Sequence, residues 1–113
     1  ESENGPVLEI ETGGPDVVGG EKGETPREYR LDQNFPNPFN PKTVVSSQLP
    51  AAGEVRLAIY DLLGREVAVL VEERRAAGIY HDAFDASGLA SGTYLYRLKA
   101  NGFVKTRTML VVK

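Results

Sequence analysis

The side chains that could carry out catalysis are few, and their spacing matches no catalytic arrangement. His81 is the only histidine among the 113 residues, and it lies in an alternating stretch between Tyr80 and Asp82. A hydrolytic triad needs a serine on a strained turn with a histidine in reach, whereas Ser87 and Ser91 flank glycines, as turn residues do. We therefore expect His81 to be an ordinary strand residue and the chain not to be an enzyme.

The carboxylates do not outline a metal site. Asp82 and Asp85 would come near Asp61 only if the fold brought them together, and their spacing differs from that of a calcium-binding loop. The sequence contains no cysteine, so disulfides and thiolate metal sites are excluded. We expect neither a metal nor a cofactor, and a calcium site formed by Asp and Asn in loops is the minor alternative.

Charge divides the chain into two parts. Residues 1–28 contain eight acidic and two basic side chains (net −6), whereas residues 29–113 contain eight acidic and eleven basic ones (net +3). Six of the twelve glycines lie in the first 23 residues. Such a composition predicts a flexible acidic linker over 1–28, although residues 6–11 could instead be the last strand of a preceding domain. Because the first residue is not methionine, we interpret the chain as a piece of a longer protein.

Two classes of partner are excluded by composition. Neither part of the chain is basic enough to predict nucleic-acid binding. No apolar run approaches the roughly 20 residues that a membrane-spanning helix needs.

From residue 29 onward, apolar and polar residues alternate with period two, and glycines separate the runs. This pattern predicts an all-β, antiparallel β-sandwich without helices. The expected strands are 43–49, 54–61, 65–72, 79–84, 93–99 and 103–112, with a short seventh over 29–33.

Two hairpins are predicted from the segregation of side chains between the two faces of a strand pair. For Asn101-Gly102, a two-residue turn would place Leu98 beside Lys105, so a three-residue loop over 100–102 is favoured, with Leu98 opposite Val104. A similar loop over 62–64 would pair Ile59 with Val67, Leu57 with Val69 and Val55 with Val71. Gly64 and Gly102 should both have positive φ. The expected core comprises Val45, Leu49, Val55, Leu57, Ile59, Val67, Val69, Val71, Phe84, Leu89, Tyr94, Tyr96, Leu98, Val104 and Leu110.

This register would gather four cations, Arg97, Lys99, Lys105 and Arg107, on the face opposite the core. One interpretation is a solvated face that discourages pairing at the sheet edge. The other is a docking patch for an anionic partner, either a protein or lipopolysaccharide. Aromatic side chains that could stack on sugar rings are Tyr29, Phe35, Phe39, Tyr60, Tyr80 and Phe103, although the chain has no tryptophan.

The segment Asn34-Phe35-Pro36-Asn37-Pro38-Phe39-Asn40-Pro41, called here the lead-in (residues 34–41), is rich in proline. Proline fixes φ and has no N–H, so the lead-in can be neither a helix nor a central strand. We expect a stiff, extended segment that places Phe35 and Phe39 on the end of the β-fold.

The lead-in together with Leu31-Asp32-Gln33 resembles the opening of the C-terminal sorting domains of the type IX (Por) secretion system, type A. The resemblance continues through residues 43–45, 49–50, 55–67 and 91–98 and ends with 105–113, and it also extends to the Ig-like domain of flagellar hook-capping proteins. Phe84 stands where that family commonly has tryptophan. The motif residues implied to be recognised are Asn34, Pro36, Asn37, Pro38, Asn40, Gly92, Tyr94, Lys105, Val111, Val112 and Lys113.

This resemblance implies a seven-stranded Ig-like or fibronectin III-like sandwich over 29–113, monomeric, at the C-terminus of a larger cargo protein. The cargo would cross the periplasm and the outer membrane of a Bacteroidetes-like bacterium and become secreted or attached to the cell surface. The implied partners are the outer-membrane translocon, a sortase-like peptidase and lipopolysaccharide. Cleavage is expected in the linker, in the region marked by Thr12, Gly20 and Arg27. The alternatives are a retained Ig-like spacer or cell-attachment module and, third, a carbohydrate-binding module.

Overall fold

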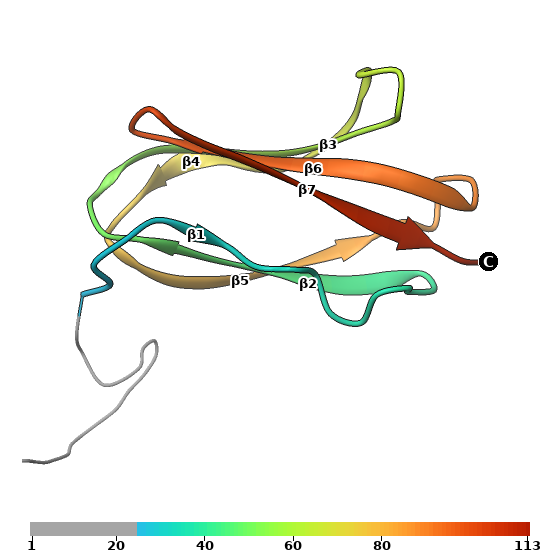
Figure 1. Cartoon of the computed structure of the whole chain (residues 1–113), viewed down its shortest axis with the longest axis horizontal. Coiled ribbons are helices and arrows are strands. Elements are labelled where there is room, and N and C mark those ends of the chain that lie inside the picture. The colour runs from blue at the N-terminus through green and yellow to red at the C-terminus, as the bar shows by residue number, and fades with distance from the viewer. Residues whose placement is uncertain (1–24) are drawn as a thin grey trace, which may run out of the picture.

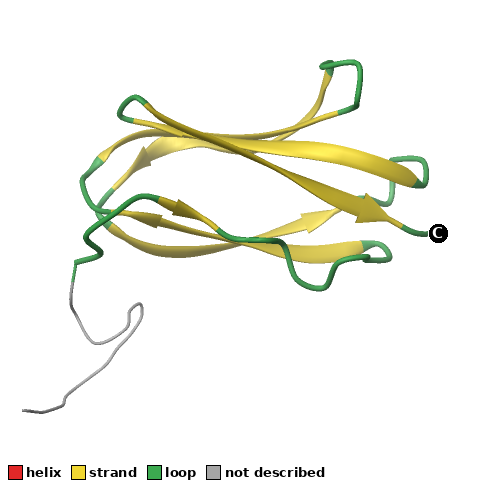
Figure 2. Ribbon diagram, viewed as in Figure 1, coloured by secondary structure: helices red, strands yellow, loops and turns green. Residues whose placement is uncertain are grey.

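The computed structural model describes residues 25–113, which form two antiparallel sheets packed face to face (Figures 1 and 2). The first sheet has the order β1-β2-β5, with β1 (Arg30–Leu31), β2 (Lys42–Leu49) and β5 (Gly78–Asp85). The second has the order β4-β3-β6-β7, with β4 (Glu66–Arg75), β3 (Gly53–Tyr60), β6 (Gly92–Ala100) and β7 (Phe103–Val111). The predicted seven-stranded, Ig-like β-sandwich is confirmed, and every expected strand is present with its ends shifted by a few residues.

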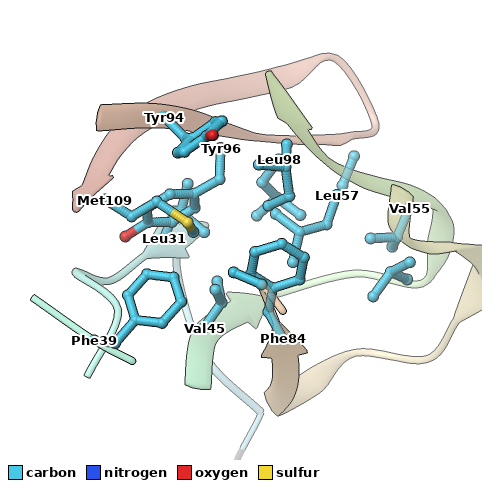
Figure 3. Close-up of a cluster of buried hydrophobic side chains, with 14 of the residues drawn as sticks. Leu31, Phe39, Val45, Val55, Leu57, Phe84, Tyr94, Tyr96, Leu98 and Met109 are labelled. Atoms are coloured by element: carbon cyan, nitrogen blue, oxygen red, sulfur yellow. The ribbon is translucent and has the colours of Figure 1, made fainter. Parts of the chain in front are cut away.

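The core lies between the two sheets and is built from alternate positions of the strands (Figure 3). In β2, for example, Thr43, Val45, Ser47 and Leu49 are buried while their neighbours are not. The expected core residues that are buried are Val45, Leu49, Val55, Leu57, Ile59, Val71, Phe84, Tyr94, Tyr96 and Leu98, with Leu89 partly buried against them. Four expected core residues are exposed: Val67, Val69, Val104 and Leu110. Leu31, Phe39, Met109 and Val111 are buried instead.

The predicted register of the β6–β7 hairpin is wrong by one residue. Ala100 pairs with Phe103 and Leu98 with Lys105, so the connection is a two-residue turn. Asn101 has φ 49° and Gly102 has φ 85°. These are the values of a type I′ turn, which Asn-Gly favours because its twist matches that of the strands.

The side chains tolerate this register because β7 is an edge strand. The observed register places Lys105 and Arg107 on the same side of the sheet as Met109 and Val111. Because β7 is at the edge, the charged ends of these two side chains can reach solvent past the rim of the sandwich. Val104, Thr106, Thr108 and Leu110 take the outer face. The turn geometry outweighs the segregation of polar from apolar residues on which the sequence-based register depended.

The β3–β4 loop is as predicted, but the register beyond it is not. Tyr60 pairs with Glu66 across residues 62–64, and Gly64 has φ 85°. Two irregularities in the ladder then place Ile59 opposite Ala68 and Leu57 opposite Val71. Each β-bulge adds a residue to β4 and shifts the phase of its alternation. This shift is why Val67 and Val69, both expected in the core, are exposed.

Among residues 25–113 there is no helix of the length and hydropathy that crossing a membrane requires.

Candidate functional site

The lead-in and the end of β7 lie side by side, although more than 70 residues separate them in sequence (Figure 1). The Phe39 N–H donates to the Leu110 carbonyl (3.0 Å), and the Val112 N–H donates to the Phe39 carbonyl (2.9 Å), which forms a parallel bridge between Phe39 and Val111. The Leu110 N–H donates to the Asn37 side-chain oxygen (2.9 Å). The lead-in therefore covers this part of the edge of β7.

Of the two aromatic side chains of the lead-in, one is buried and the other is exposed. Phe39 is buried and meets the Phe84 ring edge-on, with the ring centroids 6.3 Å apart (Figure 3). Phe35 exchanges two backbone hydrogen bonds of 3.0 Å with Val44 of β2, and its side chain is 80% exposed. The prediction that both rings pack on the fold is thus right for Phe39 and wrong for Phe35, which shares the outer face of the sheet with the exposed Val44.

Asn34 fastens the start of the lead-in from inside the protein. The residue is 2% exposed, and its amide nitrogen donates to the Pro36 carbonyl (3.2 Å) and to the Thr43 hydroxyl (3.0 Å). Its side-chain oxygen accepts from Gln33 (2.7 Å), and its backbone N–H donates to the Tyr96 hydroxyl (2.9 Å). A buried amide must have such partners, so the role of Asn34 in this structure is to hold the backbone of the lead-in.

Two tyrosines of β6 complete this attachment. The Tyr96 hydroxyl donates to the Asp32 carbonyl (2.7 Å), and burial raises the pKa of Tyr96 above its usual value. The Tyr94 hydroxyl donates to the Ala90 carbonyl (2.8 Å), four residues upstream. That local bond is the tyrosine corner known from Ig-like sandwiches. Tyr96 thus joins distant parts of the chain, whereas Tyr94 fixes the entry to its own strand.

The last residue is held as well. The Lys113 N–H donates to the Ser91 hydroxyl (3.0 Å), and its ammonium group donates to the Ser87 carbonyl (3.0 Å). Gly92 pairs with Val111 at the start of β6. Both serines that flank glycines therefore act as turn residues that receive the end of β7.

The structure gathers all but one of the predicted recognition residues at this site. The exposed ones are Pro36, Asn37, Pro38, Asn40, Val112 and Lys113, and the buried ones are Asn34, Tyr94 and Val111, with Gly92 intermediate. Lys105 is the exception, because it lies in the first half of β7, away from the lead-in.

The four cations predicted to lie together on the face opposite the core, Arg97, Lys99, Lys105 and Arg107, do not share one face. With the observed register, Arg97 and Lys99 lie on the outer face, whereas Lys105 and Arg107 lie on the inner side at the rim. Arg97 donates to Thr106 (3.2 Å) and lies 5.1 Å from the centroid of the Tyr60 ring. Arg107 donates to the Leu31 carbonyl (2.6 Å). The four cations still surround the β6–β7 hairpin, from both sides.

An open hollow of about 340 Å³ lies beside this hairpin. Its charged lining residues are Glu54, Arg56, Glu72 and Lys99. Arg56 is already engaged with Glu72 (3.3 Å) and with Glu66 (2.7 Å). Opposite charges along the lining compensate one another, so the hollow gives no preference for an anionic or a cationic ligand.

The residues considered for catalysis are not brought together. His81 shares a hydrogen bond with Ser46 (2.7 Å) on the exposed face of the smaller sheet. Asp82 accepts two hydrogen bonds from Arg75 (2.8 and 3.0 Å), which raise the pKa of that guanidinium above its usual range. Asp85 accepts from Ser87. No group of three or more potential metal ligands occurs within the described part of the chain.

The expected cleavage region falls largely outside the described residues. Thr12 and Gly20 precede residue 25, and Arg27 is exposed near the start of the described chain.

A family model described as the secretion system C-terminal sorting domain matches residues 33–113, which include the lead-in and all strands from β2 to β7. Comparison with curated proteins and with solved structures finds no match. Domains of this family imply a secretion or sorting signal on a secreted or cell-surface protein, and they suggest a non-catalytic module. Because the match covers most of the sequence, the chain belongs to the family of secretion system C-terminal sorting domains.

Proposed function

We propose that this chain directs a larger cargo protein through the type IX secretion system to the cell surface or the medium, and that the outer-membrane translocon reads the exposed part of the site. One observation carries the proposal: the lead-in and the end of β7 are joined by backbone hydrogen bonds. Their exposed residues become neighbours only after folding. A receptor that binds both segments would therefore recognise the folded module.

Phe35 is the strongest contact candidate on this surface. Its side chain is 80% exposed, and the backbone bonds to Val44 fix its position. An aromatic ring that contributes little to its own core offers a large apolar contact area to a partner. Pro36, Pro38 and Asn40 are exposed on the same lead-in.

The sorting proposal can be tested by fusing residues 20–113 behind a periplasmic reporter in cells with a working type IX system. The reporter should appear outside the cell. If the reporter stays in the periplasm while the fusion is intact and folded, sorting is contradicted and the retained spacer or cell-attachment module becomes the better interpretation.

Matched variants separate recognition from folding. Phe35→Ala should reduce export of the reporter while leaving the stability of the domain within about 0.5 kcal/mol of the parent, since the removed ring is exposed. Leu63→Ala removes a side chain of similar exposure (79%) from the β3–β4 loop and serves as the control, which should be exported normally. Normal export of Phe35→Ala would remove Phe35 from the recognised surface without contradicting sorting itself.

We further propose that a sortase-like peptidase removes the module by cutting between Thr12 and Arg27, after which the cargo can be joined to lipopolysaccharide. The composition of residues 12–28, rich in glycine and acidic side chains, supports an accessible segment there. Limited proteolysis with a non-specific protease should leave 29–113 intact. Early cuts within 56–112, with 12–28 protected, would contradict both the boundary and the cleavage proposal.

The carbohydrate-binding alternative has weaker support. Tyr29 stacks on Phe103 with the ring centroids 4.9 Å apart, and Arg75 covers the Tyr80 ring at 4.4 Å from its centroid. Among the six aromatic residues considered for sugar stacking, Phe35 alone is largely exposed. A single exposed ring does not make a platform for a sugar chain.

A further inference from the structure

The outer edge of β7 is covered over its second half and open over its first. In an antiparallel pair closed by a two-residue turn, the closing residues share hydrogen bonds, and the groups of every second residue point away from the partner strand. In β7 these outward groups belong to the even-numbered residues, as the bonds of Leu110 to the lead-in show. Gln33 donates to the Thr108 carbonyl (2.7 Å).

Further toward the turn, this cover ends. Within residues 25–113, the backbone N–H and C=O groups of Val104 and Thr106 and the N–H of Thr108 have no hydrogen-bond partner outside the strand ladder. Unpaired groups in a row along an edge strand form a template for a further strand. The open edge (residues 104–108) is therefore long enough for a short extended segment to pair with it.

The side chains along the open edge are cationic on one face and small or β-branched on the other. Lys105 and Arg107 lie on the inner side of β7, and Val104, Thr106 and Thr108 lie on the outer side. Neither cation forms an ion pair with any carboxylate of the described residues. Among residues 25–113, Arg107 donates a single hydrogen bond, to the Leu31 carbonyl, and a guanidinium has further donors available.

We propose that the open edge of β7 binds an extended acidic segment of a partner polypeptide, which adds to the four-stranded sheet as a fifth strand. Its carboxylates, at every second residue, face Lys105 and Arg107, and its intervening residues face Val104 and Thr106. This inference deepens the proposed sorting function, on which it rests for the partner's place in export. The strand pairing itself needs no secretion machinery.

The charges decide against two other occupants. If two copies paired through antiparallel β7 strands centred on Thr106, Lys105 of one copy would lie opposite Arg107 of the other. Like charges directly opposite each other in a sheet are destabilising. A basic strand would meet the same repulsion, whereas an acidic strand gains a cross-strand charge pair at each of the two positions.

The competing interpretation is that Lys105 only protects the edge, because inward-pointing charges are one device by which proteins prevent pairing at a free edge. An edge that is protected from pairing and an edge that selects its partner differ in the strands that they bind. A protected edge should bind no strand of either charge, whereas a selective edge should bind an acidic strand and reject a basic one.

The test is an NMR titration of the full 113-residue chain with a short, end-blocked peptide in which glutamate alternates with threonine. We expect saturable shifts of the Val104, Thr106 and Thr108 amides and slower hydrogen exchange at these amides. A peptide with lysine in place of glutamate should not bind. The acidic peptide N-methylated along its pairing edge should not bind either, because it keeps the charge and loses the hydrogen bonds.

Variants of the chain sharpen the result. Lys105→Glu should weaken binding of the acidic peptide by about fivefold or more, while Lys99→Glu, on the outer face one strand away, should change it by less than about twofold. Thr106→Pro removes an outward N–H that β6 does not use and should abolish binding, whereas Thr106→Val should retain it.

Absence of binding by the acidic peptide, or equal binding by its N-methylated form, would overturn the inference, and so would equal binding by the lysine peptide. Self-association of the chain through β7 would overturn the choice of an acidic partner. Because the titration uses no cells, a negative result here leaves the reporter-export test of sorting unaffected, and failed export leaves the strand-pairing result unaffected.

Discussion

The two halves of β7 solve the problem of an exposed sheet edge differently. Leu110 and Val112 are bonded to the lead-in, the Thr108 carbonyl accepts from Gln33 just before it, and Met109 and Val111 are buried beneath. From Val104 to Arg107 no residue of 25–113 bonds to the outward backbone groups, and the inner positions beyond Phe103 are the charged Lys105 and Arg107.

This difference separates two uses of one strand. In the covered half, the motif residues hold the sandwich together and fix the geometry of the exposed lead-in beside them. In the open half, the backbone is free to bind a further strand, and the cations decide which strand is accepted. A motif residue in the covered half can therefore be essential for export because it is essential for folding.

The largest expected contrast between the halves is in stability. Met109→Ala removes a side chain that is 1% exposed and should lower the free energy of unfolding by about 2–5 kcal/mol. Val104→Ala removes one that is 53% exposed and should change it by no more than about 0.5 kcal/mol. Urea unfolding measures both values, and equal losses would mean that the two halves are equally packed.

The attachment of the lead-in should depend more on Tyr96 than on Tyr94. Tyr96→Phe leaves the Asn34 N–H and the Asp32 carbonyl without their partner, which should cost about 1–3 kcal/mol. Tyr94→Phe removes one local bond to Ala90 and should cost about 1 kcal/mol. Hydrogen exchange should accelerate in the lead-in for the Tyr96 variant only. If both variants accelerate it equally, the lead-in is not held chiefly by Tyr96.

The type I′ turn fixes the register of the open half. Gly102→Ala places a side chain at φ 85°, which should cost about 1–3 kcal/mol in backbone strain. Gly88→Ala is a matched control, because an added Cβ there meets nothing within 4 Å and the glycine has no positive φ. In Gly102→Ala, we expect faster hydrogen exchange at the amides of β7 that lie nearest the turn. Equal stability of the two variants would contradict the turn assignment.

The smallest expected effect is the pH dependence of the contact at Lys113. The hydrogen bonds from the Ser87 hydroxyl and the Ser87 N–H hold the pKa of Asp85 below its ordinary value of 3.8. A carboxylate with a lowered pKa stabilises the fold above that ordinary value, and its contribution is lost as the pH falls through the lowered pKa. Below about pH 4, the rate of amide hydrogen exchange should therefore rise at Ser87 and Lys113 but not at Lys105. Asp85→Asn should remove this pH dependence. A matching rise at Lys105 would indicate general unfolding instead.

The strands were predictable because alternation is a local property of the sequence. The positive φ of Gly64 and Gly102 was predictable for the same reason. The register of β6–β7 was not predictable in this way, because it depended on charged residues avoiding the inner face. At an edge strand that assumption fails, since Lys105 can reach solvent from either face.

Non-local contacts were harder to predict than turns. The two bulges of β3–β4 leave no clear mark in the sequence, yet they move Val67 out of the core. In the candidate site, the lead-in was correctly expected to place Phe39 on the fold. The pairing of the lead-in with β7 was not predicted, and neither was the exposure of Phe35. The bridges to β2 and β7 decide which of the two aromatic residues faces inward, and these bridges are non-local contacts. Given the two-residue turn, the alternation of side chains along β7 places Met109 and Val111 on the inner face.

The parallel bridge between Phe39 and Val111 has a mechanical consequence. Tension applied at the two ends of the described chain would pull Phe39 and Val111 in opposite directions along their own axes, because the two segments run the same way. The hydrogen bonds of Phe39 to Leu110 and Val112 would then be loaded together in shear, and could not break one at a time. Resistance to unfolding by force is governed by the barrier to rupture. This short bridge beside Lys113 would thus be the first element loaded from the C-terminal end, whereas β1 and the Phe35–Val44 bridge would be loaded first from the N-terminal end.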